Sequence, residues 1–166
     1  MVKLDIIFVG TLKERWLTDA VAEYEKRISA WTICRFIRRI QKFRSRPERL
    51  SDKPSPAEVQ NAIKREGERI IAAIPPRSHV IALCVEGKQL SSPEFSEKLV
   101  SLESCGVSEF CFIIGGSDGL SDEVKKRAAM HLSISEMTFP HQLMRVILLE
   151  QIYRAFSIAS GGKYHK

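Results

Sequence analysis

The sequence lacks long hydrophobic runs. None of its apolar stretches approaches the ~20 residues that a membrane-spanning helix needs. Its first residues do not combine a basic start, an apolar core and a small-residue cleavage site. We therefore expect a soluble, cytoplasmic protein with no membrane partner.

Cysteine is scarce and scattered. The four cysteines, Cys34, Cys84, Cys105 and Cys111, form no Cys-x-x-Cys pair, and no two histidines stand at metal-ligand spacing. This pattern argues against a zinc site and indicates reduced thiols of the kind found in the cytosol. We expect no bound metal.

The common phosphate-binding signatures are also missing. The glycine-rich stretch 115–119 has neither the Gly-Lys-Ser/Thr ending of a P-loop nor the Gly-x-Gly-x-x-Gly spacing of a dinucleotide site. Adjacent glycines either form a plain tight turn or let a flat ligand approach the backbone closely. A nucleotide-binding, flavodoxin-like module is thus disfavoured, and retention of flavin or nucleotide would test it.

What the chain does contain is enough apolar material for a core. With 166 residues, 44% of them hydrophobic, we expect a single domain over residues 1–166, because two halves would each be marginally stable. The formal charge of +6 attracts polyanions. It is compatible with nucleic acid, with acidic lipid or with no polyanionic partner.

Short apolar runs alternate with segments of helical periodicity. The runs predict strands at 2–9, 31–40, 79–85, 110–114 and about 132–135. The periodic segments predict helices at 16–28, 56–74, 92–104, 121–130 and 141–159. Ser55 is the expected cap of the second of these helices and Ser92 that of the third. This order predicts an α/β fold with a mainly parallel sheet and flanking helices. Ligands bind such sheets at the carboxyl ends of the strands, here in loops that begin near Gly10, Glu86, Gly115 and Ser135.

A basic stretch follows the second predicted strand. Lys42, Arg44, Arg46 and Arg49 are interrupted by prolines, which predicts an exposed loop. Its charges are either simply solvated or contact phosphate groups without reading sequence.

Two further segments are ambiguous. Residues 134–139 offer backbone hydrogen-bonding groups to a ring such as adenine, with Met137 and Phe139 as apolar walls, although such residues more often pack in a core. In the last helix, an arginine among apolar residues must reach solvent, a carboxylate or a ligand. Arg154 either pairs with Glu150 one turn earlier or contacts a ligand.

Taken together, these motifs are more specific than any one of them. The chain contains Phe-Ile-Ile-Gly-Gly-Ser-Asp-Gly-Leu at 112–120, Leu-Ser-x-Ser-x-Met-Thr-Phe-Pro-His at 132–141, Arg-Val at 145–146, Glu-Gln-x-Tyr-Arg-Ala at 150–155 and a terminal Tyr-His-Lys. It resembles the RlmH family, small SPOUT-class methyltransferases that modify large-subunit ribosomal RNA. Val-Gly at 9–10, Glu-Tyr at 23–24 and Glu-Gly at 66–67 extend the resemblance along nearly the whole chain. The segment 35–56 departs most from the family pattern.

The resemblance implies a SPOUT-type fold with a C-terminal trefoil knot, the knotted cofactor-binding part spanning about 78–166. It implies S-adenosyl-L-methionine as cofactor. The matching cofactor-binding positions are Leu83, Gly115, Ile134, Ser135, Glu136, Met137, Thr138 and Phe139.

The family is homodimeric, with the active site at the subunit interface and no separate RNA-binding domain. It methylates N3 of a pseudouridine in 23S rRNA of the assembled ribosome. N3 is a weakly acidic imide nitrogen, so a nearby cation or base would raise its reactive fraction. We therefore expect Arg154, Tyr164 and His165 to be catalytic: Arg154 to stabilise charge and contact phosphate or base, Tyr164 to stack on the base, and His165 to accept a proton or orient the base. The alternative is a non-catalytic ribosome-binding or RNA-binding protein of the same fold.

Overall fold

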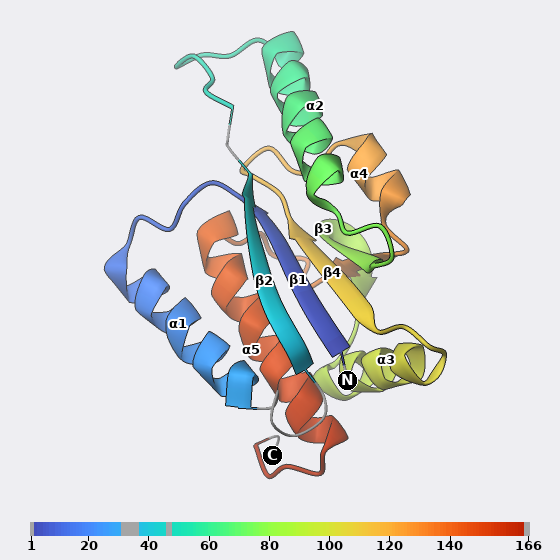
Figure 1. The fold of residues 1–166 in the computed structure, drawn as a ribbon. Coiled ribbons are helices and arrows are strands. Elements are labelled where there is room, and N and C mark those ends of the chain that lie inside the picture. Colours follow the sequence, from blue (N-terminus) through green and yellow to red (C-terminus); the bar gives the residue numbers. More distant parts are fainter. Residues whose placement is uncertain (1, 31–36, 46–47, 165–166) are drawn as a thin grey trace.

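Five parallel strands lie side by side in the part of the chain that the computed structural model describes, residues 2–30, 37–45 and 48–164 (Figure 1). The elements in chain order are β1 (Val2–Val9), α1 (Arg15–Ala30), β2 (Ile37–Ser45), α2 (Pro56–Ala73), β3 (His79–Gln89), α3 (Ser92–Ser104), β4 (Glu109–Ile114), α4 (Asp122–Arg127), β5 (Met130–Ser133) and α5 (His141–Ala159). The expected α/β fold with a parallel sheet is confirmed, and so is its alternation of five strands with five helices over these residues.

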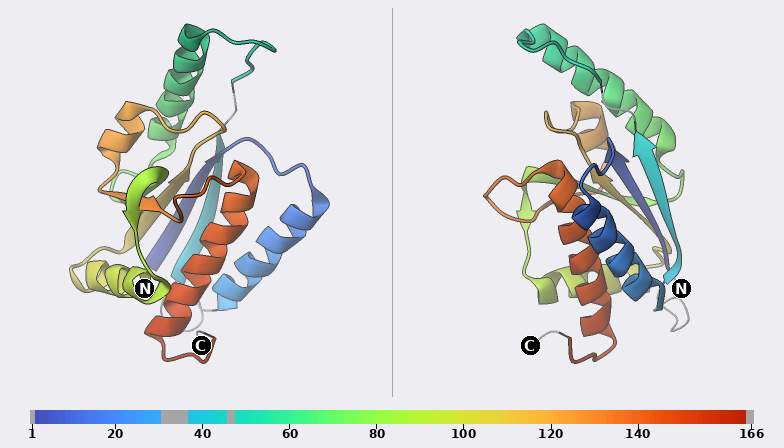
Figure 2. Two further views of the ribbon diagram at one scale, coloured as in Figure 1. Left: turned by 180° about the vertical axis from the view of Figure 1, so that it is seen from behind. Right: turned by 90° about the vertical axis from the view of Figure 1, so that its left-hand side faces the viewer.

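Helices cover both faces of the sheet. Figure 2 shows α1, α3 and α5 in front of one face, whereas α2 and α4 pack on the other. The sequence of β4 explains this, because side chains of a strand alternate between faces. Phe110 and Phe112 pack with α1, α3 and α5, while Cys111 and Ile113 pack with α2 and α4. A strand buried on both sides needs the continuous apolar run seen here.

The strand order is β2-β1-β4-β3-β5. After β1 the chain continues to β2 at one edge of the sheet, and after β4 it continues to β5 at the opposite edge. The loops after Val9 and Ile114 therefore diverge between adjacent strands. Such a point is where ligands bind in open parallel sheets.

Several element boundaries differ from the sequence prediction. Lys42 and Arg44 lie in β2 rather than in a loop, because this segment pairs with β1 up to Ser45. Part of the predicted strand 31–40, together with Arg46 and Pro47, lies outside the described residues. Helix α4 ends at Arg127 instead of residue 130, since the Ala129 N–H donates to Val80 O (2.9 Å) and leads the chain into β5.

Strand β3 is longer than predicted and bends within its second half. Its pairing with β5 is interrupted between Leu83 and Lys88, and both residues pair with Leu132. The cap of α3 is Ser91 rather than Ser92, because the Ser91 hydroxyl accepts from Glu94 N–H (3.4 Å). The bend places residues 84–87 at the carboxyl edge of the sheet.

None of the described helices combines the length and the apolarity that a bilayer crossing needs. Cys84, Cys105 and Cys111 are free thiols, while Cys34 falls outside the described ranges. Burial raises the pKa of Cys111 to about 12, so this side chain stays a neutral thiol.

Candidate active site

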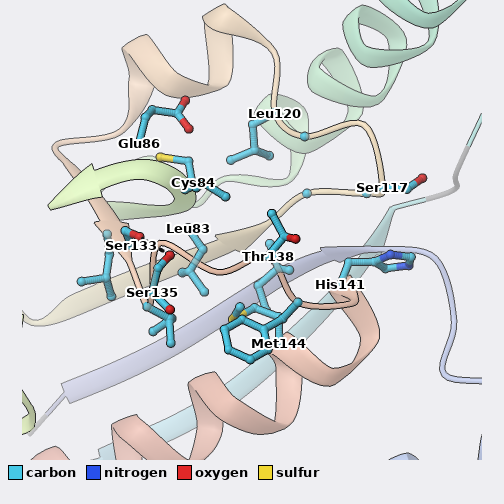
Figure 3. Close-up of a pocket in the computed structure, with 18 of the residues that line it drawn as sticks. Leu83, Cys84, Glu86, Ser117, Leu120, Ser133, Ser135, Thr138, His141 and Met144 are labelled. Carbon is cyan, nitrogen blue, oxygen red and sulfur yellow. Dashed lines mark hydrogen bonds between the residues drawn. The ribbon is translucent and has the colours of Figure 1, made fainter. Parts of the chain in front are cut away.

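The bend of β3 and the segments after β4 and β5 meet at one edge of the sheet and enclose a cavity of about 250 Å³ (Figure 3). This volume is near the lower end of the ~300–1,000 Å³ that is typical of small-molecule sites. The lining residues come from strands, the glycine turn, α4, the 133–139 loop and the first turn of α5: Leu83–Glu86, Ile114–Ser117, Gly119, Leu120, Lys125, Leu132–Ser135, Met137–Phe139, His141 and Met144. Seven of the eight predicted cofactor positions line this cavity.

The glycine turn after β4 folds back on itself. Gly119 N–H donates to Gly116 O (3.2 Å), and Gly119 adopts a positive φ of 90°. A Cβ on Gly115 would lie 2.8 Å from Gly119 O and 3.0 Å from a Leu120 methyl carbon. The turn is therefore both a tight turn and a wall of the cavity, and only glycine fits at residue 115 without a rearrangement.

The 133–139 segment arches over the strand ends. The Ser133 hydroxyl donates to Ser135 O (3.0 Å), and the Ser135 hydroxyl accepts from Met137 N–H (3.0 Å). Met137 is 74% exposed and Phe139 is 37% exposed, so both are walls at the mouth of the cavity rather than core residues. Glu136 is exposed, and it does not line the cavity.

Sequence reasoning missed an ion pair at the cavity wall. Lys125 Nζ lies 2.5 Å from Glu86 Oε1. The bond to Lys125 lowers the pKa of Glu86, and the bond to Glu86 raises the pKa of Lys125. Burial, followed by the Glu86 charge, raises the pKa of Cys84, which stays a neutral thiol. The position of Glu86 just past an apolar run was the one sequence signal for this pair.

A second polar group that the sequence did not assign lies at the start of α5. Arg145 is only 5% exposed; its Nη2 donates to Val9 O (2.7 Å) and its guanidinium carbon lies 4.0 Å from the centre of the Phe8 ring. A carbonyl at a strand end and an aromatic face thus compensate for the burial of this charge. One turn earlier, His141 lines the cavity, and burial followed by the Arg145 charge lowers its pKa.

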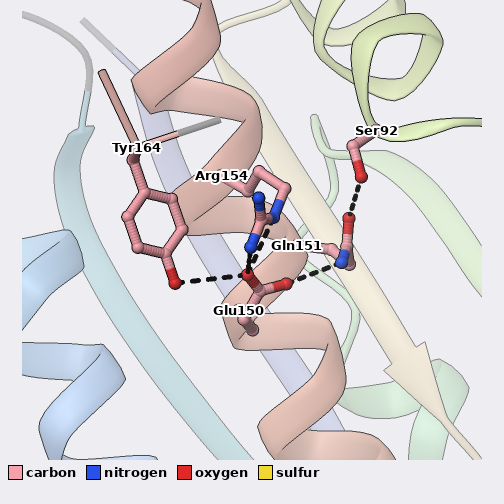
Figure 4. A network of polar contacts seen from close by, with 5 residues as sticks. All are labelled: Ser92, Glu150, Gln151, Arg154 and Tyr164. Carbon is pink, nitrogen blue, oxygen red and sulfur yellow. Dashed lines mark hydrogen bonds and ion pairs between the residues drawn. The ribbon is translucent and has the colours of Figure 1, made fainter. Parts of the chain in front are cut away.

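Arg154 and Tyr164 gather around Glu150 instead (Figure 4). Arg154 donates to Glu150 Oε1 from Nε (2.8 Å) and Nη2 (2.5 Å), and the Tyr164 hydroxyl donates to the same oxygen (3.4 Å). The guanidinium carbon of Arg154 lies 4.6 Å from the Tyr164 ring centre. Gln151 joins Glu150 Oε2 (2.6 Å) to the Ser92 hydroxyl (2.8 Å) on α3.

Within one chain the cavity and this Glu150 cluster are separated. Met144 lines the cavity, and Arg154 is ten residues further along α5, or ~15 Å at the helical rise per residue. The Tyr164 ring packs against the Arg154 guanidinium, so it is also distant from the cavity, and His165 lies outside the described residues. The structure therefore brings seven cofactor candidates together but places Arg154 and Tyr164 apart from them.

Residues 2–165 match the family described as predicted SPOUT methyltransferases. The chain belongs to the SPOUT methyltransferase family. Among similar SPOUT proteins, the ribosomal RNA large subunit methyltransferase H of Carboxydothermus hydrogenoformans is 49% identical, over 99% of each chain. The protein of that name from an Exiguobacterium species is 47% identical, over 98% of this chain and 99% of its own length.

A solved structure agrees with this assignment at the level of the fold. The probable methylase family protein of Haemophilus influenzae Rd KW20 superimposes with a TM-score of 0.52 at 14% identity, covering 98% of this chain and 70% of the other. The parallel sheet with helices on both faces is thus a SPOUT fold. No group of three or more His, Cys, Asp or Glu side chains that could hold a metal occurs in the described ranges.

Proposed function

We propose that this SPOUT methyltransferase transfers a methyl group from S-adenosyl-L-methionine to N3 of a pseudouridine in 23S rRNA, acting on the assembled ribosome in the cytoplasm. The convergence of three strand ends on one cavity supports this proposal most directly. The names of the relatives that match along nearly their full length support ribosomal RNA as the substrate.

The residues at the cavity fit the proposed methyl donor. Leu83, Met137 and Phe139 offer apolar walls for a flat ring, and Gly115 leaves room beside the backbone. The 134–139 segment arches over the strand ends, and its backbone groups other than the Met137 N–H, which donates to the Ser135 hydroxyl, can pair with ring nitrogens. When bound, S-adenosyl-L-methionine would supply an electrophilic methyl group; the chain itself would orient it and exclude water. The part of the chain that holds it would be about 78–166, with the trefoil knot that the family implies.

We assign Arg154, Tyr164 and His165 to the RNA side of the site. Arg154 would stabilise negative charge, Tyr164 would stack on the base, and His165 would orient the base or accept its proton. Because Arg154 lies ~15 Å along α5 from the cavity in one chain, these residues would act on the cavity of a second subunit. The proposal thus includes a homodimer with a shared active site.

The proposal is tested by incubating the protein with labelled S-adenosyl-L-methionine and ribosomes that lack the modification. We expect label in 23S rRNA, and a raised melting temperature with the donor alone, equivalent to ~2.7 kcal/mol at a hundred times its Kd. A non-catalytic ribosome-binding protein would bind ribosomes without either effect. Light scattering should give about twice 18.9 kDa.

The assignment of the tail residues has its own test. Arg154→Ala, and removal of residues 164–166, should each lower methylation of ribosomes at least tenfold while the donor still raises the melting temperature. Arg15→Ala is the matched control, because Arg15 pairs with Asp19 four residues along its helix (3.8 Å) just as Arg154 pairs with Glu150. Unchanged methylation in either tail variant would refute these roles.

A further inference from the structure

Four ionisable side chains line the cavity among the described residues: Cys84, Glu86, Lys125 and His141. Glu86 and Lys125 are paired with each other at 2.5 Å. The pKa of Cys84 is raised by burial, so its thiolate is scarce at neutral pH. His141 is therefore the one lining group of this set that is a free base near neutral pH.

The other histidines are placed differently. His79 lines a separate cavity beside α3, and a ring nitrogen of His131 lies 2.8 Å from Lys125 O. His165 is outside the described residues. His141 alone among the described histidines lines the candidate active site.

The imidazole of His141 lies beside the end of β1, close to Arg145. It is half-buried at the first residue of α5, and Figure 3 shows it at the edge of the cavity. A Cβ placed on Gly10 would lie 4.0 Å from His141 Nε2 and 3.9 Å from Arg145 Nη2, so both side chains converge on the end of β1. Arg145 is fixed there by its bond to Val9 O (2.7 Å).

We propose that His141 accepts the N3 proton of the target base and that Arg145, which converges with it on the end of β1, is its positioning residue. This inference rests on the proposed function. An imidazole nitrogen takes the proton, and the electron pair of the N–H bond stays on N3. N3 then bonds to the methyl carbon as the carbon–sulfur bond of the donor breaks, its electron pair remaining on sulfur. The imidazolium finally releases its proton to water.

The surrounding charges are consistent with a neutral imidazole. The charged residues on the segments nearest to His141 are Arg145 on α5, Lys13 after β1, and Asp118 with Glu66 beside the glycine turn. Burial and then Arg145 lower the pKa of His141. A general base must be unprotonated to act, so this environment keeps it available at pH 7.

The first test is the pH dependence of single-turnover methylation on ribosomes lacking the modification. In the wild type we expect the rate to rise with pH below 6.5 and then to level off. His141→Gln should slow transfer at pH 7 by about 100-fold. Its rate should also keep rising above pH 8, because reaction then depends on N3 ionising without a base.

Two matched variants make this test specific. His165→Gln should keep the shape of the wild-type profile even if the rate falls, and His131→Gln should leave both rate and profile unchanged. A wild-type profile in His141→Gln, or loss of the low-pH limb in His165→Gln, would overturn the inference. An inactive wild type would refute the proposed function instead.

The second test needs no catalysis. In NMR spectra of protein with labelled histidine, the His141 resonance should titrate below pH 6.5 and shift when S-adenosyl-L-methionine is added. Arg145→Gln should move this titration toward 6.5, whereas Arg145→Lys should keep it low. Should Arg145→Gln not fold, the wild-type titration decides, and a His141 that titrates at 6.5 or above would overturn the inference.

Discussion

Two arginines of α5 show how local surroundings decide the role of one residue type. Arg145 is almost fully buried and bonds the end of β1, whereas Arg154 remains 25% exposed and pairs with Glu150. The sequence rule that an arginine in an apolar helix needs a partner holds for both. Spacing identified the partner of Arg154, four residues away, but not that of Arg145, which is 136 residues away.

Gly67 is a close-contact position between α2 and the segment before α4. A Cβ there would lie 2.1 Å from Ser121 Oγ and 2.8 Å from Ser121 Cβ. We expect Gly67→Ala to lower the free energy of unfolding by about 1–3 kcal/mol through overpacking, in spite of alanine's better helix propensity. Urea titration measures this.

The clash at Gly67 can be checked with a second substitution. In a Ser121→Gly background both clashing atoms are absent, so the added cost of Gly67→Ala should fall close to zero or become a gain. An equal cost in both backgrounds would mean that another contact is responsible. The two measurements together isolate the contact between Gly67 on α2 and Ser121 in the segment before α4.

The histidines predict how stability depends on pH. Burial lowers the pKa of His79 and of His141 below 6.5, so the unfolded chain binds more protons than the folded one below this pH. Stability should be constant above about pH 7.5 and should fall as the pH decreases through 6.5. The urea midpoint at pH 5.5 should therefore lie below that at 7.5, and the difference should shrink in the double variant His79→Gln, His141→Gln. A midpoint that rises on acidification would contradict the direction of both shifts.

At the scale of elements, the starts of helices were predicted more closely than the limits of strands. The Ser55 cap of α2 is confirmed: its hydroxyl accepts from Glu58 N–H (3.2 Å), and Glu58 Oε2 accepts from Ser55 N–H (2.7 Å). The predicted end of α4 and the limits of β3 and β5 were wrong. Those limits depend on pairing between strands, which local sequence does not encode.

The capping box of α2 offers a quantitative test. Ser55→Ala removes one acceptor for the first turn and should destabilise the protein by ~1 kcal/mol. Ser51→Ala, in the exposed segment before the helix, should change stability by less than about 0.5 kcal/mol. Equal effects in thermal or urea unfolding would show that the cap contributes nothing specific.

At the scale of the whole molecule, the charge of +6 should govern association with ribosomes. Binding should weaken as salt rises, because phosphate contacts release counterions. Arg49→Ala, in the exposed segment after β2, should reduce the slope of log affinity against log salt by about 1, whereas Lys26→Ala on α1 should leave it unchanged. A flat salt response of the wild type would exclude an electrostatic footprint.

Part of the site could be predicted from the sequence, because ligands bind parallel sheets at the carboxyl ends of the strands. Loops near Glu86, Gly115 and Ser135 were expected at one edge of the sheet, and residues of all three line the cavity. Lys125, His141 and Met144 were missed since they approach the cavity from helices. A helical pattern shows which face is buried, but not which loop that face covers.

The sequence alone determined the alternation of strands and helices along the chain and the resemblance to the family, because periodicity, caps and motifs are local properties of the chain. Only the tertiary structure decided that Arg145 reaches Val9, that His141 lines the cavity and that Arg154 lies apart from it. These facts depend on how α5 crosses the sheet, and that crossing is fixed by packing between segments more than 100 residues apart.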